Sequence, residues 1–254
     1  METLVELSIY WIITLAFVAF CAGYIDAIAG GGGMLNLPAL LFAGVPPVSA
    51  LAVSKMNAIA GTVLAVIKYT LSKKVHWQTV TIAALPCLAA SYLGGKLALV
   101  TPVIVLTWAI LICIPIALFI VLRDSTDSNE EETTNAPKTL MAIAPIGFYD
   151  GILGPGTGTY MTIAVRKILK FNLLKANATI KPLNLLSNIG AAMAFLLAGK
   201  VIWMIAIPMV FASSIGGWLG SQSAIEGGDK FIRTLLIIVL SIMLIANVIK
   251  LVLS

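Results

Sequence analysis

Long apolar stretches, separated by short polar or glycine-rich breaks, run along almost the whole chain. Several exceed the roughly 18 residues that a helix needs to cross the hydrocarbon core of a bilayer. They are continuous rather than alternating, which excludes a transmembrane β-barrel. The pattern predicts an all-α polytopic membrane protein, with helical segments at 8–28, 34–42, 48–71, 79–99, 102–122, 139–152, 159–169, 173–198, 202–224 and 231–253.

Two of the breaks share one construction, in which an aspartate precedes a glycine-rich stretch. The first is Gly-Tyr-Ile-Asp-Ala-Ile-Ala-Gly-Gly-Gly-Gly at 23–33, and the second is Gly-Phe-Tyr-Asp-Gly-Ile-Leu-Gly-Pro-Gly-Thr-Gly at 147–158. The long segment that follows each break carries small or polar residues at one helical spacing, namely Ser54, Asn57 and Gly61, then Lys181, Asn184 and Asn188. This internal match predicts two repeats, 1–123 and 138–254, joined by an acidic linker at 124–137.

Basic residues distribute oppositely in the two predicted repeats. The loop at 44–47 has no Lys or Arg, whereas the equivalent loop of the second repeat has Arg166, Lys167, Lys170 and Lys175. Because short basic loops stay in the cytoplasm, the bias predicts inverted-topology repeats, with both termini external. Each repeat is then a Gly-broken re-entrant hairpin plus three transmembrane helices, giving about eight hydrophobic helices. The alternative is eight segments that each cross the membrane once.

Composition supports the membrane assignment and narrows the chemistry. Of the 254 residues 60% are hydrophobic and 11% charged, against about 25% charged in soluble domains. The net charge of +5 sits at helix ends rather than in one stripe, so we expect no nucleic-acid partner. One histidine and three scattered cysteines provide neither a metal-ligand spacing nor a nucleophile–base pair. We therefore expect no enzyme activity, no metal and no cofactor.

Four charged residues fall well inside apolar segments, and these are Asp26, Lys55, Asp150 and Lys181. A charge at mid-bilayer is costly, and such residues usually mark a transport pathway. The alternative is a buried Lys–Asp pair that only locks the bundle. Asp26 and Asp150 are candidates either for proton coupling or for structural capping of the breaks. The amides of Asn57, Asn184 and Asn188 predict a polar cavity, with plain helix packing as the alternative.

The glycine-rich breaks themselves have a physical use. A half-helix that begins inside the membrane presents backbone N–H groups and the positive end of its dipole, which together bind anions. We expect the two breaks to face each other and bind an anion through Gly30, Gly31, Gly32, Gly33, Gly154, Gly156, Thr157 and Gly158. Tight turns or close helix crossings are the alternative explanation.

The first break, followed by a proline and by Gly-Val-Pro-Pro at 44–47, resembles the signature of the sulfite exporter TauE/SafE family of membrane permeases. The Asp-Gly-Ile-Leu-Gly-Pro-Gly-Thr-Gly stretch at 150–158 is similar to the family's second signature. The resemblance implies transport of small sulfur-containing anions, usually outward and driven by the proton gradient. It points to Asp26, Asp150, Pro155 and the glycines of both breaks.

These observations give one leading functional hypothesis and two alternatives. The leading one is a secondary transporter that exports sulfite, sulfoacetate or a related organosulfonate, with Lys55, Lys181, Asn57, Asn184 and Asn188 assisting the breaks. An uptake permease for another small anion or sulfur metabolite is the first alternative, and a non-transport membrane partner or enzyme is the second. The expected location is the inner or plasma membrane, as a multi-pass protein whose partners are the anion and the lipid bilayer. The protein could also form a homodimer, which the sequence does not decide.

Overall fold

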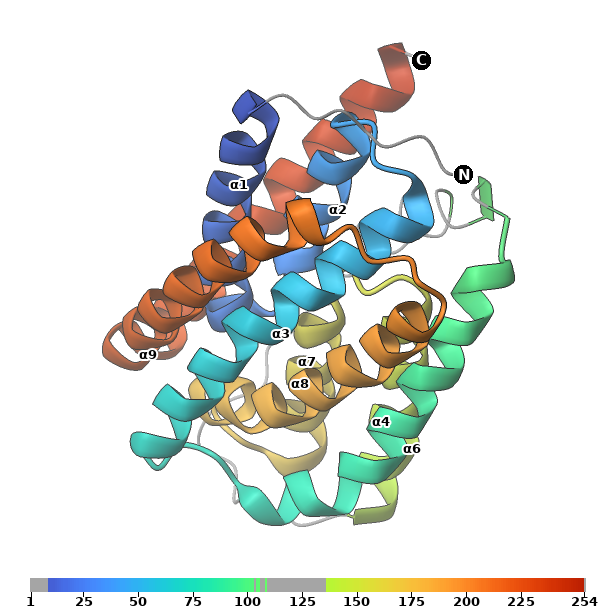
Figure 1. The fold of residues 1–254 in the computed structure, drawn as a ribbon. Helices are drawn as coiled ribbons and strands as arrows, with labels where there is room; N and C mark the ends of the chain where they lie inside the picture. Colours follow the sequence, from blue (N-terminus) through green and yellow to red (C-terminus); the bar gives the residue numbers. More distant parts are fainter. Residues whose placement is uncertain (1–8, 103, 106–107, 109–135, 254) are drawn as a thin grey trace.

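The computed structural model describes residues 9–102, 104–105, 108 and 136–253, and this part of the chain is entirely helical (Figure 1). The helices of the first half are α1 (Ile9–Ala29), α2 (Gly32–Phe42), α3 (Pro47–Leu71) and α4 (Trp77–Val100). Those of the second half are α6 (Ala136–Ile152), α7 (Thr157–Leu169), α8 (Leu173–Leu197) and α9 (Trp203–Leu253). The predicted all-α class is confirmed for these residues.

Helix ends fall where the sequence contains residues that stop or start helices. Gly30 directly follows α1 and has a φ of 75°, and Gly44 follows the C-terminal end of α2 and has a φ of 81°. Glycine adopts such positive φ angles at no steric cost. Pro47 occupies the first turn of α3, where its missing N–H is not needed. The Asn172 side chain caps α8 by accepting a hydrogen bond of 2.8 Å from the Lys175 backbone N–H.

Five of the described helices are long and apolar enough to cross a membrane: α1, α3, α4, α8 and the part of α9 up to Ile238. The α2 helix is shorter but also apolar. The predicted segment at 102–122 and the linker at 124–137 lie mostly outside the described residues. The described part of α6 starts at Ala136, and the predicted linker boundary stays a prediction.

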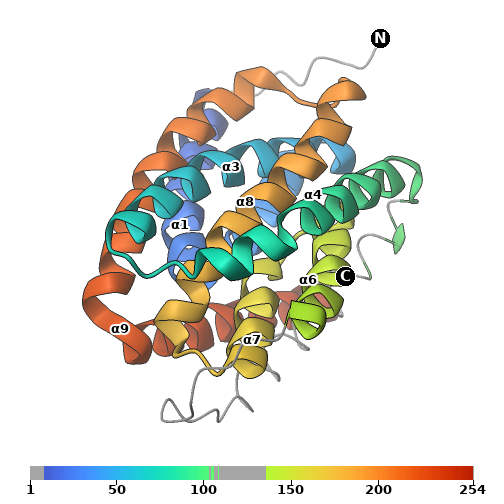
Figure 2. The ribbon, with the colours of Figure 1, turned by 90° about the horizontal axis from the view of Figure 1, so that it is seen from below.

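The last two predicted segments, 202–224 and 231–253, correspond to two helical stretches that meet at a kink within α9. The kink is at Gly228, inside the gap expected between these segments, where the φ of 62° and ψ of −162° are not helical. Figure 2 shows the sharp change of direction that results at one corner of the molecule. Because essentially only glycine tolerates this backbone conformation, Gly228 ends the first helical stretch and turns the chain into the second.

The two halves interlock rather than packing side by side. Helix α1 packs mainly on α9, and α6 packs mainly on α4, so the first helix described in each half contacts a helix of the other half. Glycines make both contacts close, since Gly216 meets the backbone of α1 at Phe20 and Gly94 meets that of α6 at Phe148. Helices α3 and α8 cross between them, and α8 is the most buried of the long helices.

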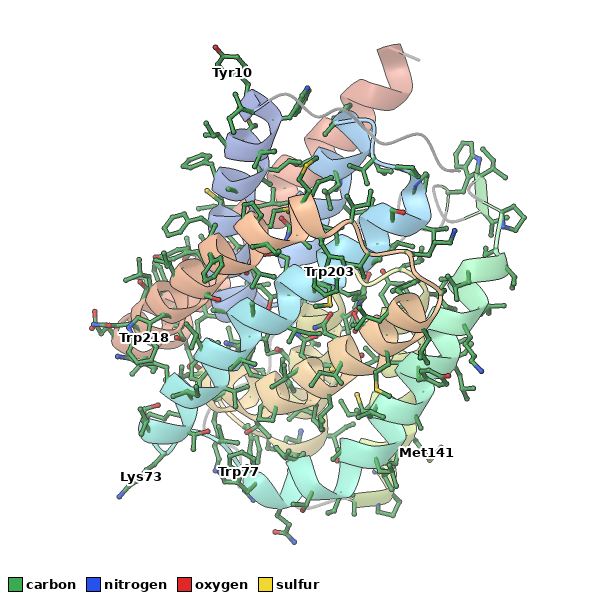
Figure 3. The ribbon with its side chains drawn as sticks, in the orientation of Figure 1. Tyr10, Lys73, Trp77, Met141, Trp203 and Trp218 are labelled. Carbon is green, nitrogen blue, oxygen red and sulfur yellow. The ribbon has the colours of Figure 1, made fainter. Side chains whose placement is uncertain are left out.

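Large apolar side chains project outward from this bundle (Figure 3). Met141 is 78% exposed and Trp203 is 52% exposed, and many other large apolar side chains are exposed as well. Exposing so much apolar surface to water would be unfavourable. Trp77 lies near Lys73 at one end of the bundle, as expected for an aromatic anchor beside a basic loop. An apolar outer surface with polar residues inside is the arrangement that lipid favours.

Candidate functional site

The two glycine-rich breaks meet in the interior of the bundle. A Cβ atom at Gly30 would collide with the backbone of Gly158, and one at Gly158 would collide with Gly30. The Thr159 hydroxyl also bridges the breaks, because it donates a hydrogen bond of 2.8 Å to the carbonyl oxygen of Ala29. The expectation that the breaks face each other therefore agrees with the geometry, and glycine is required at the point of contact.

The second break is held in shape by its own side chains. Gly154 and Gly156 adopt φ angles of 86° and 79° on either side of Pro155. The Tyr149 hydroxyl donates to the Pro155 carbonyl at 2.7 Å, and the Thr157 hydroxyl donates to the Gly154 carbonyl at 2.8 Å. These bonds fix the start of α7 next to the first break.

The four intramembrane charges form two ion pairs, and each pair joins the two halves. Lys55 Nζ lies 2.7 Å from Asp150 Oδ1, and Lys181 Nζ lies 3.7 Å from Asp26 Oδ2. Lys181 also donates a hydrogen bond to the backbone carbonyl of Asp26. Each lysine thus lies on a long helix of one half of the chain and pairs with the aspartate of the other half. Pairing compensates charges that would otherwise be unfavourable in this environment.

The two aspartates differ in how tightly they are held. Asp150 is 2% exposed and accepts a hydrogen bond of 2.5 Å from the Ser187 hydroxyl in addition to its Lys55 contact. Asp26 is 14% exposed, and its carboxylate accepts longer bonds from the Gly32 backbone N–H at 3.2 Å and from Thr62 at 3.3 Å. The sites are therefore related by sequence but unequal in structure.

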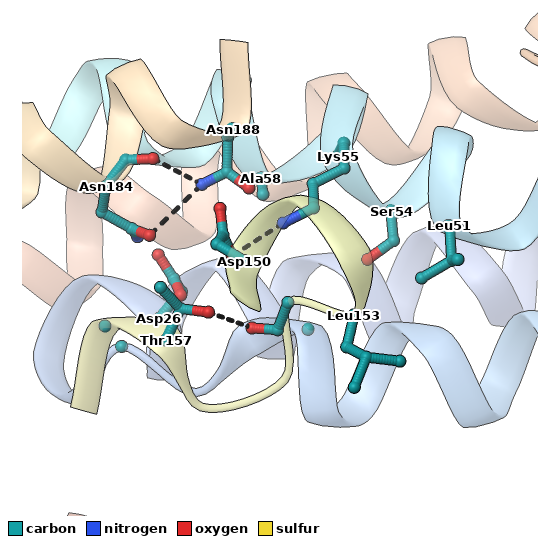
Figure 4. Close-up of a pocket in the computed structure, with 14 residues that line it drawn as sticks. Asp26, Leu51, Ser54, Lys55, Ala58, Asp150, Leu153, Thr157, Asn184 and Asn188 are labelled. Carbon is teal, nitrogen blue, oxygen red and sulfur yellow. Dashed lines mark hydrogen bonds and ion pairs between the residues drawn. The ribbon is translucent and has the colours of Figure 1, made fainter. Parts of the chain in front are cut away.

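A small cavity lies where the breaks and the ion pairs converge (Figure 4). Its volume is ≈ 20 Å³, whereas one water needs on the order of 10–15 Å³ on this measure. The cavity is therefore too small for a sulfur oxyanion in this conformation. It is lined by Asp26, Gly30, Gly33, Leu51, Ser54, Lys55, Ala58, Asp150, Leu153, Gly154, Thr157, Gly158, Asn184 and Asn188.

Most of the residues predicted from the sequence line this cavity, but five do not. Gly32 and Asn57 line a separate, smaller cavity next to it. Gly31 lies near the Ile25 side chain, and Gly156 packs against Met34. Lys181 is fully buried behind Asp26 and reaches the cavity only through that residue. Placement alone does not assign a role, so the binding and coupling roles stay predictions.

Several residues of the site were not predicted. Leu51, Ala58 and Leu153 line the cavity, and Ser187 donates a hydrogen bond to Asp150. Ser54 also lines the cavity, and the sequence indicated it only as part of the polar face of its segment. Ser187 was detectable, since it lies one helical turn after Asn184 on the polar face that includes Lys181. The apolar lining residues carry no comparable signal, because leucine and alanine are common throughout the chain.

The described residues contain no cluster of three or more His, Cys, Asp or Glu side chains that could hold a metal ion. The polar groups that converge on the cavity are instead amides, hydroxyls, two carboxylates and an ammonium group. Asn188 donates to the backbone carbonyl of Asn184 at 2.8 Å, which orients both amides on one face of α8. Such groups bind and release a small ion by hydrogen bonding and charge.

Comparison with known proteins is consistent with this architecture. Residues 15–247 match the family described as Sulfite exporter TauE/SafE. The chain is 37% identical over 249 residues to the "Probable membrane transporter protein ORF9" of Sinorhizobium sp, covering 95% of each chain. It is 35% identical over 232 residues to the "Probable membrane transporter protein YfcA" of Escherichia coli, covering 90% of this chain and 86% of the relative.

A "Probable membrane transporter protein" of Haemophilus influenzae is 31% identical over 247 residues, with 96% of each chain covered. No solved structure matches the chain. The similarity to each named relative extends over nearly the full length of both proteins. The chain therefore belongs to the TauE/SafE sulfite exporter family of membrane transporters.

Proposed function

We propose that the protein is a secondary transporter that exports a small sulfur-containing anion, such as sulfite, sulfoacetate or a related organosulfonate, in a reaction coupled to the proton gradient. The observation that carries this proposal is the convergence of Gly33, Gly158 and Lys55 on one buried cavity. The two glycines belong to the first turns of α2 and α7. Helix starts of this kind favour anions.

In this proposal the substrate's negative charge is balanced by the whole set of charged residues. The two ion pairs are neutral together, with two lysines and two aspartates. An anion entering this neutral site would add an uncompensated negative charge in a region of low polarity. Protonation of one aspartate removes that imbalance, so proton binding and anion binding favour each other. The amides of Asn184 and Asn188 would orient the substrate oxygens.

Taken alone, this charge balance favours a second candidate function, which is uptake of a small anion together with a proton, and the export direction rests on the family's description. Export driven by an inward proton gradient requires the proton and the anion to occupy the site alternately. Mutual stabilisation instead favours their movement together, and an acidic exterior then drives the anion inward. The direction of proton movement that accompanies anion flux separates the two candidates.

The interlocked packing supports an inverted-repeat mechanism. Helix α1 packs on α9 and α6 packs on α4, each a helix of the opposite half, and the two breaks touch. Transporters with inverted repeats place the substrate at such a contact and expose it alternately to each side. We propose a re-entrant hairpin and three transmembrane helices in each repeat, a plasma-membrane location, and external termini.

The test is anion binding and flux with purified protein. A true substrate binds the folded state and raises its unfolding temperature in a concentration-dependent way, so a panel of sulfite, sulfoacetate, methanesulfonate, sulfate, phosphate and chloride identifies the class. In proteoliposomes, a pH-sensitive dye then reports whether protons enter or leave with the anion. Protons moving opposite to an exported anion support export by exchange, whereas protons moving in the same direction support cotransport. Absence of both stabilisation and flux with every anion would overturn the proposal.

A further inference from the structure

A second, smaller polar chamber lies next to the anion cavity. It has a volume of ≈ 10 Å³ and lies between α1, α2, α3 and α9. Its polar lining comes from Asp26, Asn36, Asn57 and Ser213. Asp26 also lines the anion cavity, so one carboxylate faces both spaces. The chamber is otherwise walled by small residues such as Gly23 and Gly61.

The chamber gathers polar atoms that lack hydrogen-bond partners within the described part of the chain. These are Asn36 Oδ1, both side-chain polar atoms of Asn57, and Ser213 Oγ. All three residues are buried, with exposures of 2%, 0% and 1%. Buried polar groups are normally paired, and leaving them unpaired is unfavourable. Their concentration around one space therefore indicates a missing ligand.

The chemistry of these groups selects the ligand. The set contains hydrogen-bond donors, in the Asn57 amide and the Ser213 hydroxyl, as well as acceptors. A metal cation would satisfy only the oxygens and would stand near the Lys181 ammonium that already contacts Asp26. A water molecule both donates and accepts, and the volume of the chamber is close to that of one water. We propose that the chamber holds one water molecule that delivers protons to Asp26, and that Asp26 is the proton-binding residue of the transport reaction.

The charged neighbours explain the choice of Asp26 over Asp150. Asp26 faces Lys181 at 3.7 Å, and it faces Lys55 and Asp150 across the anion cavity. The buried Tyr69 hydroxyl lies on the same side but donates to the backbone of Ala27. The described residues of α2, α7 and α9 that line the two cavities contribute no charged group.

Asp150, by contrast, is held by Lys55 at 2.7 Å and by Ser187 at 2.5 Å, and it does not line the chamber. The more exposed and more loosely paired carboxylate is therefore also the one that faces the chamber. Neutral Asp26 leaves Asp150, Lys55 and Lys181 with a net positive charge that the anion neutralises. This inference rests on the proposed anion transport and assigns its coupling residue.

The test uses Ser213→Ala, which removes one partner of the proposed water, with Ser214→Ala as the matched control. The Ser214 hydroxyl is on the same helix but donates to the Val210 carbonyl at 2.8 Å. Two fluxes of an anion that stabilises the wild type are compared in proteoliposomes. One is exchange of labelled for unlabelled anion at equal, acidic pH on both sides, and the other is net flux driven by a pH jump.

We expect Ser213→Ala to lower the pH-driven flux about fivefold, the effect of one lost hydrogen bond, while equal-pH exchange stays at the wild-type rate. Ser214→Ala should leave both fluxes unchanged. A pH-driven flux at the wild-type rate in Ser213→Ala would overturn this inference but not the transport proposal. Net flux that follows a sodium gradient rather than a pH gradient would do the same. If the wild type shows no exchange of labelled for unlabelled anion at equal pH, the transport proposal itself is overturned.

A second variant and a structural readout guard against misfolding. Asn36→Leu fills the same chamber from α2 and should give the same selective loss of pH-driven flux. A high-resolution structure should show a single water within hydrogen-bond distance of Asn57 and Ser213. An empty chamber, or a cation there, would contradict the inference.

Discussion

Lys55 on α3 and Asp150 on α6 form an ion pair with 2.7 Å between Nζ and Oδ1, and the pair joins the two halves of the chain. Both side chains are at least 95% buried, since their exposures are 5% and 2%. The pair closes one wall of the cavity between the two glycine-rich breaks. The same contact thus connects the stability of the fold to the site where we propose that the anion binds.

Removing one partner of this pair should destabilise the protein more than removing both charges. Lys55→Met leaves the Asp150 charge buried without its cation, which costs on the order of 3 kcal/mol. The double variant Lys55→Met with Asp150→Asn should recover most of that loss. Thermal unfolding in detergent measures each form. Equal stability of Lys55→Met and wild type would show that the pair is not maintained in the folded protein.

The contact between the breaks should make Gly30→Ala severe. Its Cβ would collide with the backbone of Gly158, and the residue has a φ of 75°. We expect a loss of about 3 kcal/mol from the collision and the strain together. Gly44→Ala is the control, because Gly44 has a φ of 81° but no atom within 4 Å of its added Cβ.

Gly44→Ala should therefore cost only about 1 kcal/mol. The difference between the two variants isolates the contact between breaks from the backbone strain that both share. Equal losses in unfolding temperature for Gly30→Ala and Gly44→Ala would mean that the two breaks do not touch.

The hydrogen bond from Ser187 to Asp150 should be worth more than an ordinary one. Bonds to a charged group contribute about 2 kcal/mol, compared with about 1 kcal/mol for neutral partners. Ser187→Ala should therefore lower stability about twice as much as Ser221→Ala, whose hydroxyl donates to the backbone carbonyl of Trp218 at 2.9 Å. Similar effects in denaturation experiments would argue against an ionised Asp150.

Anion affinity should rise as the pH falls, because the account links anion binding to protonation of Asp26. Methanesulfonate is a suitable ligand, since its own charge does not change in the accessible range. Its affinity should increase by on the order of tenfold per pH unit where one proton is taken up with the anion, and Asp26→Asn should remove that dependence. Calorimetric titration of both proteins provides the comparison. A pH-dependence retained in Asp26→Asn would assign the proton to another group.

The sequence predicts the helices better than it predicts the contacts between them. Continuous apolar runs and the residues at their ends, such as Gly30 and Pro47, determine where helices lie, and these signals are local. Partner choice is different, because Lys55 could pair with either aspartate. The structure pairs it with Asp150, and this choice follows from the interlocked packing of α4 and α6, which no local pattern encodes.

The residues of the candidate site likewise fall into those that the sequence predicts and those that it does not. Asp26, Lys55 and the glycines were predictable because charges and glycine clusters are rare in apolar segments. Asn36 and Ser213 were not, since a single polar residue in a membrane helix usually packs against a neighbouring helix. Their importance emerges only when tertiary structure places them around the same space as Asp26.

The most direct test of the central claim is exchange of radiolabelled sulfite by wild type and Lys55→Met in proteoliposomes, with both proteins confirmed as folded. The account predicts exchange by the wild type that excess unlabelled sulfite abolishes, and a loss of at least about tenfold in the variant, since a hydrogen bond to a charged group is worth about 1.5–3 kcal/mol. Exchange in Lys55→Met at the wild-type rate would contradict an anion site between the two glycine-rich breaks.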